Sequence, residues 1–255
     1  MDKRYQNLLT AVFLVAGRGT RILEYTDKPK CLLKLKNKTL IESNIEKLVK
    51  IGISNFIIVL GYKKELIIEH LNKISKLKKI KIKYVDNKNF ISKGNSHSLL
   101  LGLNNVKNKF CFFLDGDIFL GDTILKKFIN NPKKNLALIG KGSLNDKECA
   151  KVFIDKDEKI KLMIDKIFAP KKVLNKFTFL GEAIGIIKLN NNYKNKLIRI
   201  LQKFLLKKKN YKKNWEKPLN EFLINNNLDY EYTRSNKWIE IDDKNDYLKA
   251  KRCFK

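Results

Sequence analysis

Short apolar runs rich in β-branched and aromatic residues alternate with segments of helical spacing along the first half of the chain. The apolar positions Leu40, Ile41 and Ile45 have the spacing of an amphipathic helix, which Gly52 is well placed to end. The pattern predicts strands over Ala11–Ala16, Asn55–Leu60, Ile80–Val85 and Phe110–Leu114, and helices over Thr39–Ile51, Lys64–Asn72 and Asn95–Leu103.

This alternation predicts an α/β protein with a doubly wound, Rossmann-like and mostly parallel sheet, whose ligand site lies at the carboxyl ends of the strands. From about residue 135 the elements are shorter, and the chain has neither an internal repeat nor a Pro/Gly/Ser-rich linker. We therefore expect one domain over 1–255 with a small lobe on the same sheet. The second half is predicted to contain strands over Cys149–Ile154, Gly185–Leu189 and Lys237–Ile241, and helices over Tyr193–Lys207 and Lys244–Arg252.

Composition narrows the class of protein. With 255 residues, 44% of them hydrophobic, the chain is long enough to bury a core, which argues against overall disorder. No stretch approaches the ~18–20 consecutive apolar residues of a membrane span, so we expect a cytoplasmic protein that does not enter a membrane. The four cysteines are scattered without metal-ligand spacing. His70 and His97 are the only histidines, so a histidine-rich metal site has few possible ligands.

A large excess of basic side chains raises the question of a nucleic-acid partner. Lys and Arg number 55 against 26 Asp and Glu, which gives a net charge of +29. The lysines are spread along the whole chain together with many Asn and Ile, as in proteins from AT-rich genomes. The densest cluster, Lys207–Lys213, has only Tyr211 among its lysines. We therefore attribute the charge to composition and do not expect nucleic acid as a partner.

The first strand is followed by a loop suited to bind phosphate. Gly17 and Gly19 let the backbone approach a phosphate chain closely, while Arg21 and Lys30 supply positive charge. The Gly-x-Gly pair by itself fits a plain strand-to-helix turn about equally well. The loop lacks the Gly-Lys-Ser/Thr ending of a P-loop and is not a full dinucleotide fingerprint.

Carboxylates follow the fourth strand and occupy the last one. Asp117 either binds a metal or caps the next helix, and Asp115 is the better candidate for the cap. Alternation places Glu240 and Asp242 on one face of the last predicted strand, while Asp243 can cap the terminal helix. Mg²⁺ typically takes one or two carboxylates and fills its other positions with water and phosphate oxygens. The two segments are therefore candidate halves of a magnesium site.

The phosphate loop resembles the signature of a known superfamily. Gly-x-Gly-Thr-Arg over 17–21, followed by Pro-Lys and hydrophobic residues over 29–32, resembles the nucleoside-diphosphate-sugar pyrophosphorylases, although Val15 stands where alanine is usual. The resemblance implies the GT-A-like nucleotidyltransferase fold and a triphosphate in this loop. It implies that Lys30 neutralises charge at the reacting phosphorus and that the nucleotide is bound by Ala16, Gly17, Gly19, Thr20 and Arg21.

Four further segments narrow the resemblance to one branch. Residues 114–118, 238–242, 94–99 and 181–186 resemble the bacterial phosphocholine, 2-aminoethylphosphonate and inositol-phosphate cytidylyltransferases, so the resemblance spans nearly the whole chain. It implies that Asp117 and Asp242 hold Mg²⁺ and that Gly61, Asn95 and Ser98 lie near the nucleobase and ribose. The Asn and Ser fit a helix start without ligand contact equally well.

The resemblance implies transfer of CMP from CTP to a small phosphorylated or phosphonate acceptor, with release of pyrophosphate. Residues from about 8 to 134 would form the nucleotide-binding half, and about 135 to 255 the acceptor-binding and metal-completing half. Arg21, Lys30 and Lys166 would be catalytic, although Lys166 equally fits one solvated lysine among many. Acids and an aromatic face would bind an amine or ammonium on the acceptor. The predicted acceptor-binding residues are Glu182, Trp215, Glu216 and Glu240, of which Trp215 also fits an ordinary packing role.

Two other functions compete with this one. A hexose-1-phosphate nucleotidyltransferase that uses UTP, TTP or GTP would share the phosphate loop. A non-catalytic regulatory or polyanion-binding protein on the same fold would account for the charge, but it would not need Arg21, Lys30, Asp117 and Asp242 together. The sequence leaves the acceptor and the oligomeric state open, a homodimer included.

Overall fold

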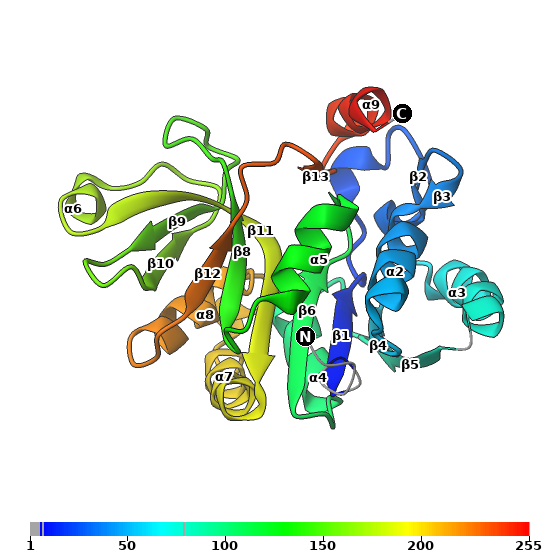
Figure 1. Ribbon diagram of the computed structural model, residues 1–255, viewed down its shortest axis with the longest axis horizontal. Coiled ribbons are helices and arrows are strands. Elements are labelled where there is room, and N and C mark those ends of the chain that lie inside the picture. The colour runs from blue at the N-terminus through cyan, green and yellow to red at the C-terminus, as the bar shows by residue number, and fades with distance from the viewer. Residues whose placement is uncertain (1–5, 7, 79, 255) are drawn as a thin grey trace.

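The structure is a computed structural model that describes residues 6, 8–78 and 80–254. Its centre is a set of parallel strands in the spatial order β6-β1-β4-β5 (Figure 1). Because the chain winds outward from β1 in one direction and then returns to add β6 on its other side, the strand order reverses between β1 and β6. Ligands bind at such a point in open α/β sheets. The four strands are β1 (Leu9–Leu14), β4 (Asn55–Leu60), β5 (Lys81–Asp86) and β6 (Phe110–Asp115).

The second half of the chain extends the same sheet. The long strand β11 (Thr178–Asn190) runs antiparallel to β6, with Ile186 opposite Leu114. Further strands pair beyond it, so that the described residues form a nine-stranded sheet whose far end carries the short helix α6 (Figure 1). These elements are β8 (Leu136–Gly140), β9 (Lys151–Ile154), β10 (Ile160–Ile164), β12 (Asp229–Tyr232) and α6 (Lys171–Leu174).

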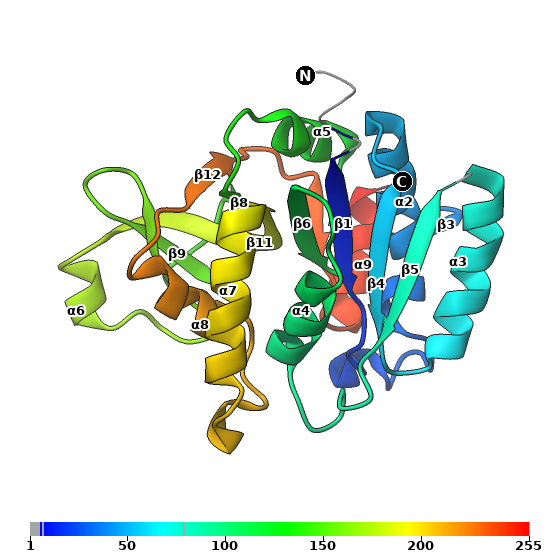
Figure 2. The same ribbon diagram turned by 90° about the horizontal axis from the view of Figure 1, so that it is seen from below.

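Helices cover both faces of the sheet, which is why β1 is buried along its whole length. Phe13 faces a core built with α2, α3 and α5, while Val12 faces a second core built with α4, α7 and α8. Figure 2 shows α4 and α7 side by side. The first face has α2 (Leu40–Ile51), α3 (Lys64–Lys78) and α5 (Asp122–Asn130); the second has α4 (Asn95–Asn104), α7 (Asn191–Phe204) and α8 (Glu216–Leu223).

Local signals in the sequence account for the helix ends. Thr39 and Glu42 form a capping box at the start of α2, and Gly52 ends that helix at φ 101°, a conformation that glycine adopts without strain. Asp243 forms a second capping box with Asp246 at the start of α9 (Lys244–Cys253), as predicted.

A small sheet joins the middle of the chain to the segment before its last helix. β7 (Ile118–Leu120) pairs antiparallel with β13 (Trp238–Glu240), so the residues after β6 lie beside the residues before α9. This pairing brings the two predicted carboxylate segments together. Short elements complete the region: η1 (Thr20–Ile22), η2 (Lys30–Leu32), β2 (Lys34–Leu35) and β3 (Lys38–Thr39).

The predicted doubly wound sheet is confirmed, and its differences from the prediction lie mostly in the second half. The expected strand Gly185–Leu189 is only part of the 13-residue β11, whose pairing shifts twice along its length. Helices were expected after Asp117 and after Glu216 without bounds, where α5 and α8 lie, but no prediction was made for β8, β10 or β12. The helix predicted to end at Lys207 ends at Phe204. Within the described part of the chain, no helix has the length and hydrophobicity needed to cross a membrane. The division into functional halves near residue 134 stays a prediction.

Candidate active site

A cavity of about 240 Å³ opens at the carboxyl ends of β1 and β6, where the strand order reverses. It is lined by the phosphate loop on one side and by residues of the second half on the other. The predicted site residues that line it are Gly17, Gly19, Lys30, Asn95, Asp117, Lys166, Glu216, Glu240 and Asp242. An adjoining hollow of about 420 Å³ is lined by Arg18, Gly19, Thr20, Arg21, Lys30, Phe90 and Ile91.

The phosphate loop needs glycine at one position for a steric reason. Gly19 has φ 61°, and a Cβ atom there would lie 2.7 Å from the Lys30 side chain. Glycine therefore lets the Lys30 side chain pass directly over the loop. A Cβ atom at Gly17 would meet nothing within 4 Å, so that position faces open space in the cavity.

Three carboxylates converge opposite this loop. One oxygen each of Asp117, Glu240 and Asp242 lie within 4.8 Å of one another, brought together by the pairing of β7 with β13. Three carboxylate oxygens at this separation fit the oxygen ligands that Mg²⁺ prefers. These residues could hold the ion, and Glu240, which was expected on the acceptor side, belongs to the same cluster.

Three cations neutralise Asp242 in this arrangement. The Lys30 ammonium lies 2.8 Å from Asp242 and 3.1 Å from Asp117, Lys166 lies 2.8 Å from Asp242, and Arg21 lies 2.5 Å from it. Burial alone would raise the pKa of the Asp242 carboxyl, but Lys30 and Lys166 outweigh burial and hold that pKa well below its usual range. Lys166 is thus not a solvated surface lysine. It adopts φ 51°, an uncommon conformation for a non-glycine residue that often marks a functional site.

Acidic groups without full compensation occupy the other wall of the cavity. Glu216 is 7% exposed, and its Oε2 atom has no hydrogen-bond partner among the described residues. Burial, with Asp165 nearby, raises its pKa to about 8. Asp115, also in this wall, has its pKa raised by burial and by the charge of Asp117. For Glu240, burial together with Asp117 and Asp242 raises the pKa to about 8. A cationic ligand would compensate these carboxyl groups.

Two predicted acceptor residues do not line the cavity. Trp215 is 1% exposed, packs edge-to-face on Phe113 at 5.3 Å and donates from Nε1 to Asp115 at 3.1 Å. This corrects the expectation that its face meets an acceptor, because the ring supports Asp115 from within the core. Glu182 lies beside Cys149, outside the cavity lining, and burial with the charge of Asp146 raises its pKa to about 7.

Two of the three predicted nucleobase residues, Asn95 and Ser98, line a third cavity. This cavity has a volume of about 90 Å³ and shares the lining residues Leu14, Gly17 and Asn95 with the main cavity. Ala16 and Ser98 line this cavity but not the main one. Gly61 lies just outside its lining, and a Cβ atom there would be 2.6 Å from the Ala16 carbonyl oxygen. Glycine at position 61 therefore permits the close contact that forms this end of the site.

Asn95 is the first residue of α4, so a helix-start role without ligand contact stays open for Asn95 and Ser98, but neither side chain caps the helix. The N-cap of α4 is Gly94, and no side chain caps it. The Asn95 side chain instead accepts from the Trp215 backbone N–H at 2.9 Å, and Ser98 accepts from Asn87 at 2.9 Å. Asp115 and Asp117 likewise do not cap the following helix, because the N-cap of α5 is Gly121.

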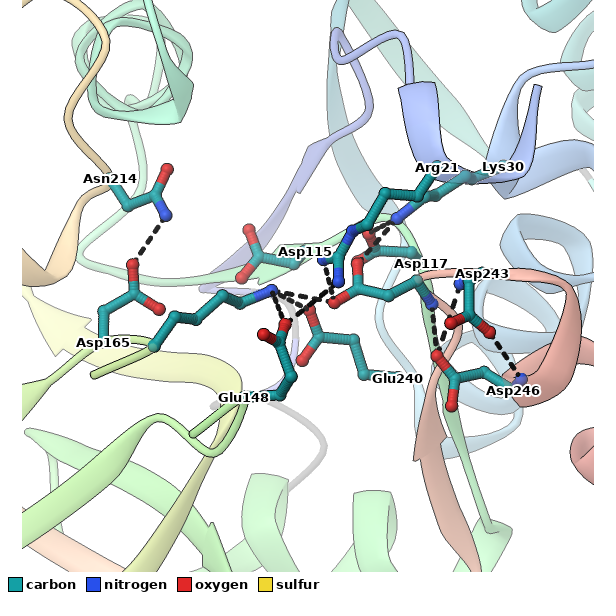
Figure 3. Close-up of polar contacts among 12 residues, drawn as sticks. Arg21, Lys30, Asp115, Asp117, Glu148, Asp165, Asn214, Glu240, Asp243 and Asp246 are labelled. Carbon is teal, nitrogen blue, oxygen red and sulfur yellow. Dashed lines mark hydrogen bonds and ion pairs between the residues drawn. The ribbon is translucent and has the colours of Figure 1, made fainter. Parts of the chain in front are cut away.

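Several residues of the site were missed from the sequence. Glu148, in the loop before β9, pairs with Arg21 at 3.0 Å, and Asn214 donates to Asp165 at 2.7 Å (Figure 3). Asp165 directly precedes the predicted Lys166, which was a usable signal. Glu148 stands in an exposed polar loop that has no pattern of its own, so only the tertiary fold assigns it to the site.

The chain was compared with known proteins. Residues 27–254 match the family described as a domain of unknown function, DUF6564. Among curated proteins, the UTP–glucose-1-phosphate uridylyltransferase AglF of Haloferax volcanii is 32% identical over 123 residues, which are 47% of this chain and 49% of that protein. The CTP:phosphoglutamine cytidylyltransferase of Campylobacter jejuni is 39% identical over 66 residues, 26% of each chain. The matches span about half or less of the length of the relatives.

Solved structures match over nearly the whole chain. The CTP:phosphocholine cytidylyltransferase of Streptococcus pneumoniae aligns with a TM-score of 0.73 and 21% identity, over 97% of this chain and 99% of that one. At this identity the likeness concerns the fold. Together with the family match, it shows that the chain belongs to the DUF6564 family and has the fold of the nucleotidyltransferases.

Proposed function

We propose that this protein is a magnesium-dependent nucleotidyltransferase that transfers CMP from CTP to a small phosphorylated or phosphonate acceptor and releases pyrophosphate. The observation that supports this most directly is the cavity in which Lys30, on the phosphate loop, faces the Asp117 and Asp242 carboxylates. Phosphoryl-group transfer needs this combination, because two polyanions must be aligned while their repulsion is offset.

In the proposed reaction an oxygen of the acceptor phosphate attacks the α-phosphorus of the nucleotide. The new P–O bond forms as the bond to the pyrophosphate oxygen breaks, and pyrophosphate leaves with that electron pair. The acceptor phosphate is already anionic near neutral pH, so no strong general base is required. Arg21 and Lys30 supply fixed positive charge for the triphosphate, and Lys166 does so from the acceptor side of the cavity. Bound Mg²⁺, held by Asp117 and Asp242, would neutralise phosphate charge as a Lewis acid.

The choice of CTP is supported by sequence similarity to a cytidylyltransferase that acts on phosphoglutamine. A second candidate is UTP-dependent transfer to a sugar phosphate, and the similarity to AglF favours it. The phosphate loop does not discriminate between these nucleotides, since it contacts the part of the nucleotide that they share.

For the acceptor, we propose a molecule with an amine or quaternary ammonium group. The buried Glu216 carboxyl has an oxygen without a partner, and Asp115 lies in the same cavity wall. Burying such groups is costly unless a positive charge compensates them. Binding would rest on charge pairing with these acids, since the Trp215 ring is enclosed in the core.

The test is a pyrophosphate-release screen that crosses CTP, UTP, ATP, GTP and TTP with phosphocholine, aminoethylphosphonate, phosphorylated amino acids and amides, sugar 1-phosphates and polyol phosphates. We expect the highest turnover for CTP with an ammonium-bearing acceptor. Preference for UTP with a sugar phosphate would establish the second candidate. Absence of pyrophosphate release in every combination, from folded protein with Mg²⁺, would contradict a transferase and favour a non-catalytic role.

A further inference from the structure

The smallest of the three cavities around the phosphate loop has an unusual polarity. Its polar side chains are Lys93, Asn95 and Ser98, and the rest of its lining is apolar or glycine. A lysine ammonium is a hydrogen-bond donor only, whereas an amide or a hydroxyl can donate or accept. Whether Asn95 and Ser98 offer a donor or an acceptor to a ligand depends on the hydrogen bonds that they make to other residues.

Asn87 has a side chain whose orientation is chemically determined. It is completely buried, and its Oδ1 atom accepts from the Asn89 backbone N–H at 3.0 Å. Since a backbone N–H can only donate, this atom must be the oxygen, and the other end of the amide is the NH₂ group. The same oxygen lies 2.9 Å from His97 Nδ1, which therefore donates to it. Both lone pairs of the oxygen are then occupied.

The NH₂ group of Asn87 determines the polarity of Ser98. Asn87 Nδ2 donates to Ser98 Oγ at 2.9 Å. The serine oxygen thus receives a hydrogen bond from behind, and its own proton has no acceptor among the described residues. Ser98 is almost fully buried and lines the small cavity, so this proton is available to a ligand there. Ser98 can therefore donate to an acceptor in the cavity, while its oxygen keeps one free lone pair.

Asn95 also offers a hydrogen-bond donor to the cavity, because its oxygen already has a partner. Its Oδ1 atom is occupied by the Trp215 backbone N–H at 2.9 Å, which leaves the NH₂ group as the part of the amide without a partner among the described residues. Asn95 lines both the small cavity and the main one. All three polar side chains of the small cavity thus offer hydrogen-bond donors.

We propose that Asn87 is a positioning residue that makes the nucleobase cavity a donor surface, through which the protein selects cytosine over uracil. This inference rests on the proposed function and on the resemblance, which implies that Asn95 and Ser98 lie near the nucleobase. The O2 and N3 atoms of cytosine are adjacent acceptors, so both match donors. Uracil has acceptors at O2 and O4 on either side of an N3–H group, so a donor that lies opposite N3 would meet that hydrogen and leave two buried groups unsatisfied. Discrimination by one such reversed hydrogen bond corresponds to about ten-fold to a hundred-fold in affinity.

The test replaces the NH₂ group of Asn87 with an oxygen, which should turn Ser98 from a donor toward the cavity into an acceptor. In Asn87→Asp the carboxylate still accepts from Asn89 N–H and His97, but it can no longer donate to Ser98. Ser98 would then donate to the carboxylate and present its lone pairs to the cavity. CTP and UTP affinities are measured by calorimetry in Mg²⁺ without acceptor, and kcat/KM for both nucleotides with the best acceptor. We expect the wild-type protein to prefer CTP about ten-fold or more, and Asn87→Asp to lower this CTP-to-UTP ratio about ten-fold.

Two further variants complete the test. Ser98→Ala removes the donor itself and should also lower the ratio, which decides the question if Asn87→Asp does not fold. Asn89→Ala keeps the backbone N–H that orients Asn87 and removes only an exposed side chain, so it should leave the ratio unchanged. Loss of affinity for CTP and UTP in equal proportion in both Asn87→Asp and Ser98→Ala would show a merely structural role and overturn the inference, as would a wild-type preference for UTP. If wild-type protein binds neither nucleotide, the proposed function itself fails.

Discussion

Glu216→Gln should make the ligand-free protein more resistant to unfolding as the pH rises. The wild-type carboxyl is buried at the cavity wall, and its pKa is raised from 4.5 to about 8 because burial and Asp165 disfavour the charged form. An unfolded chain ionises this group near its ordinary pKa, so between pH 4.5 and pH 8 the folded state binds more protons than the unfolded state. The free energy of unfolding contributed by Glu216 is therefore fully present at low pH and is lost as the pH rises through this window.

The size of the effect follows from the same shift. Each pKa unit corresponds to 1.36 kcal/mol, so the wild-type protein loses about 3 kcal/mol of stability from this group between pH 5 and pH 8. Gln cannot ionise and avoids that loss. Its amide leaves an unpaired buried group, but this cost is the same at every pH and cancels in the comparison.

The assay is urea unfolding of wild-type and Glu216→Gln protein at pH 5 and pH 8, without ligand. The stability of the variant relative to wild type should rise by about 3 kcal/mol between the two pH values. Glu148→Gln is the matched control, since Glu148 is a 62% exposed carboxylate of the same site. A difference between Glu216→Gln and wild type that stays constant over this pH range would refute the argument that Glu216 is held in its neutral form without a counter-charge.

Five substitutions test the proposed chemistry. Glu216→Gln should raise the KM of an ammonium-bearing acceptor more than it lowers kcat at saturating CTP; an equal effect on neutral acceptors would contradict the ammonium pocket. Asp117→Asn and Asp242→Asn should each remove most turnover while circular dichroism stays unchanged, and near-normal turnover at saturating Mg²⁺ would exclude that residue as a ligand. Lys30→Met should lower kcat/KM by about a hundred-fold or more, measured by pyrophosphate release. Glu148→Ala frees Arg21 from an exposed ion pair and should tighten CTP binding only a few-fold by calorimetry; weaker binding would show that Glu148 supports the site.

Prediction from the sequence succeeded wherever structure follows from neighbouring residues. The strand 55–60 has its predicted bounds, Gly52 ends α2, and Asp243 caps α9, because periodicity and capping depend on residues a few positions apart. Prediction was less complete in the second half of the chain, where β11 is much longer than its apolar pattern indicates. Its two register shifts depend on which strands lie beside it, and a single segment contains no information about that.

In the candidate site, too, some features follow from the local sequence and others only from the tertiary structure. The sequence alone predicted the phosphate loop and the two carboxylate segments, because their residues together resemble the signature of a known superfamily. The meeting of Lys30 with Asp242 joins residues 212 positions apart and exists only through the pairing of β7 with β13. The same holds for the enclosure of Trp215 behind Asp115, and for the hydrogen bond by which Asn87 orients Ser98. Residue type and spacing thus determine which chemical groups are available, whereas the direction in which each group points depends on partners that only the folded chain brings into contact.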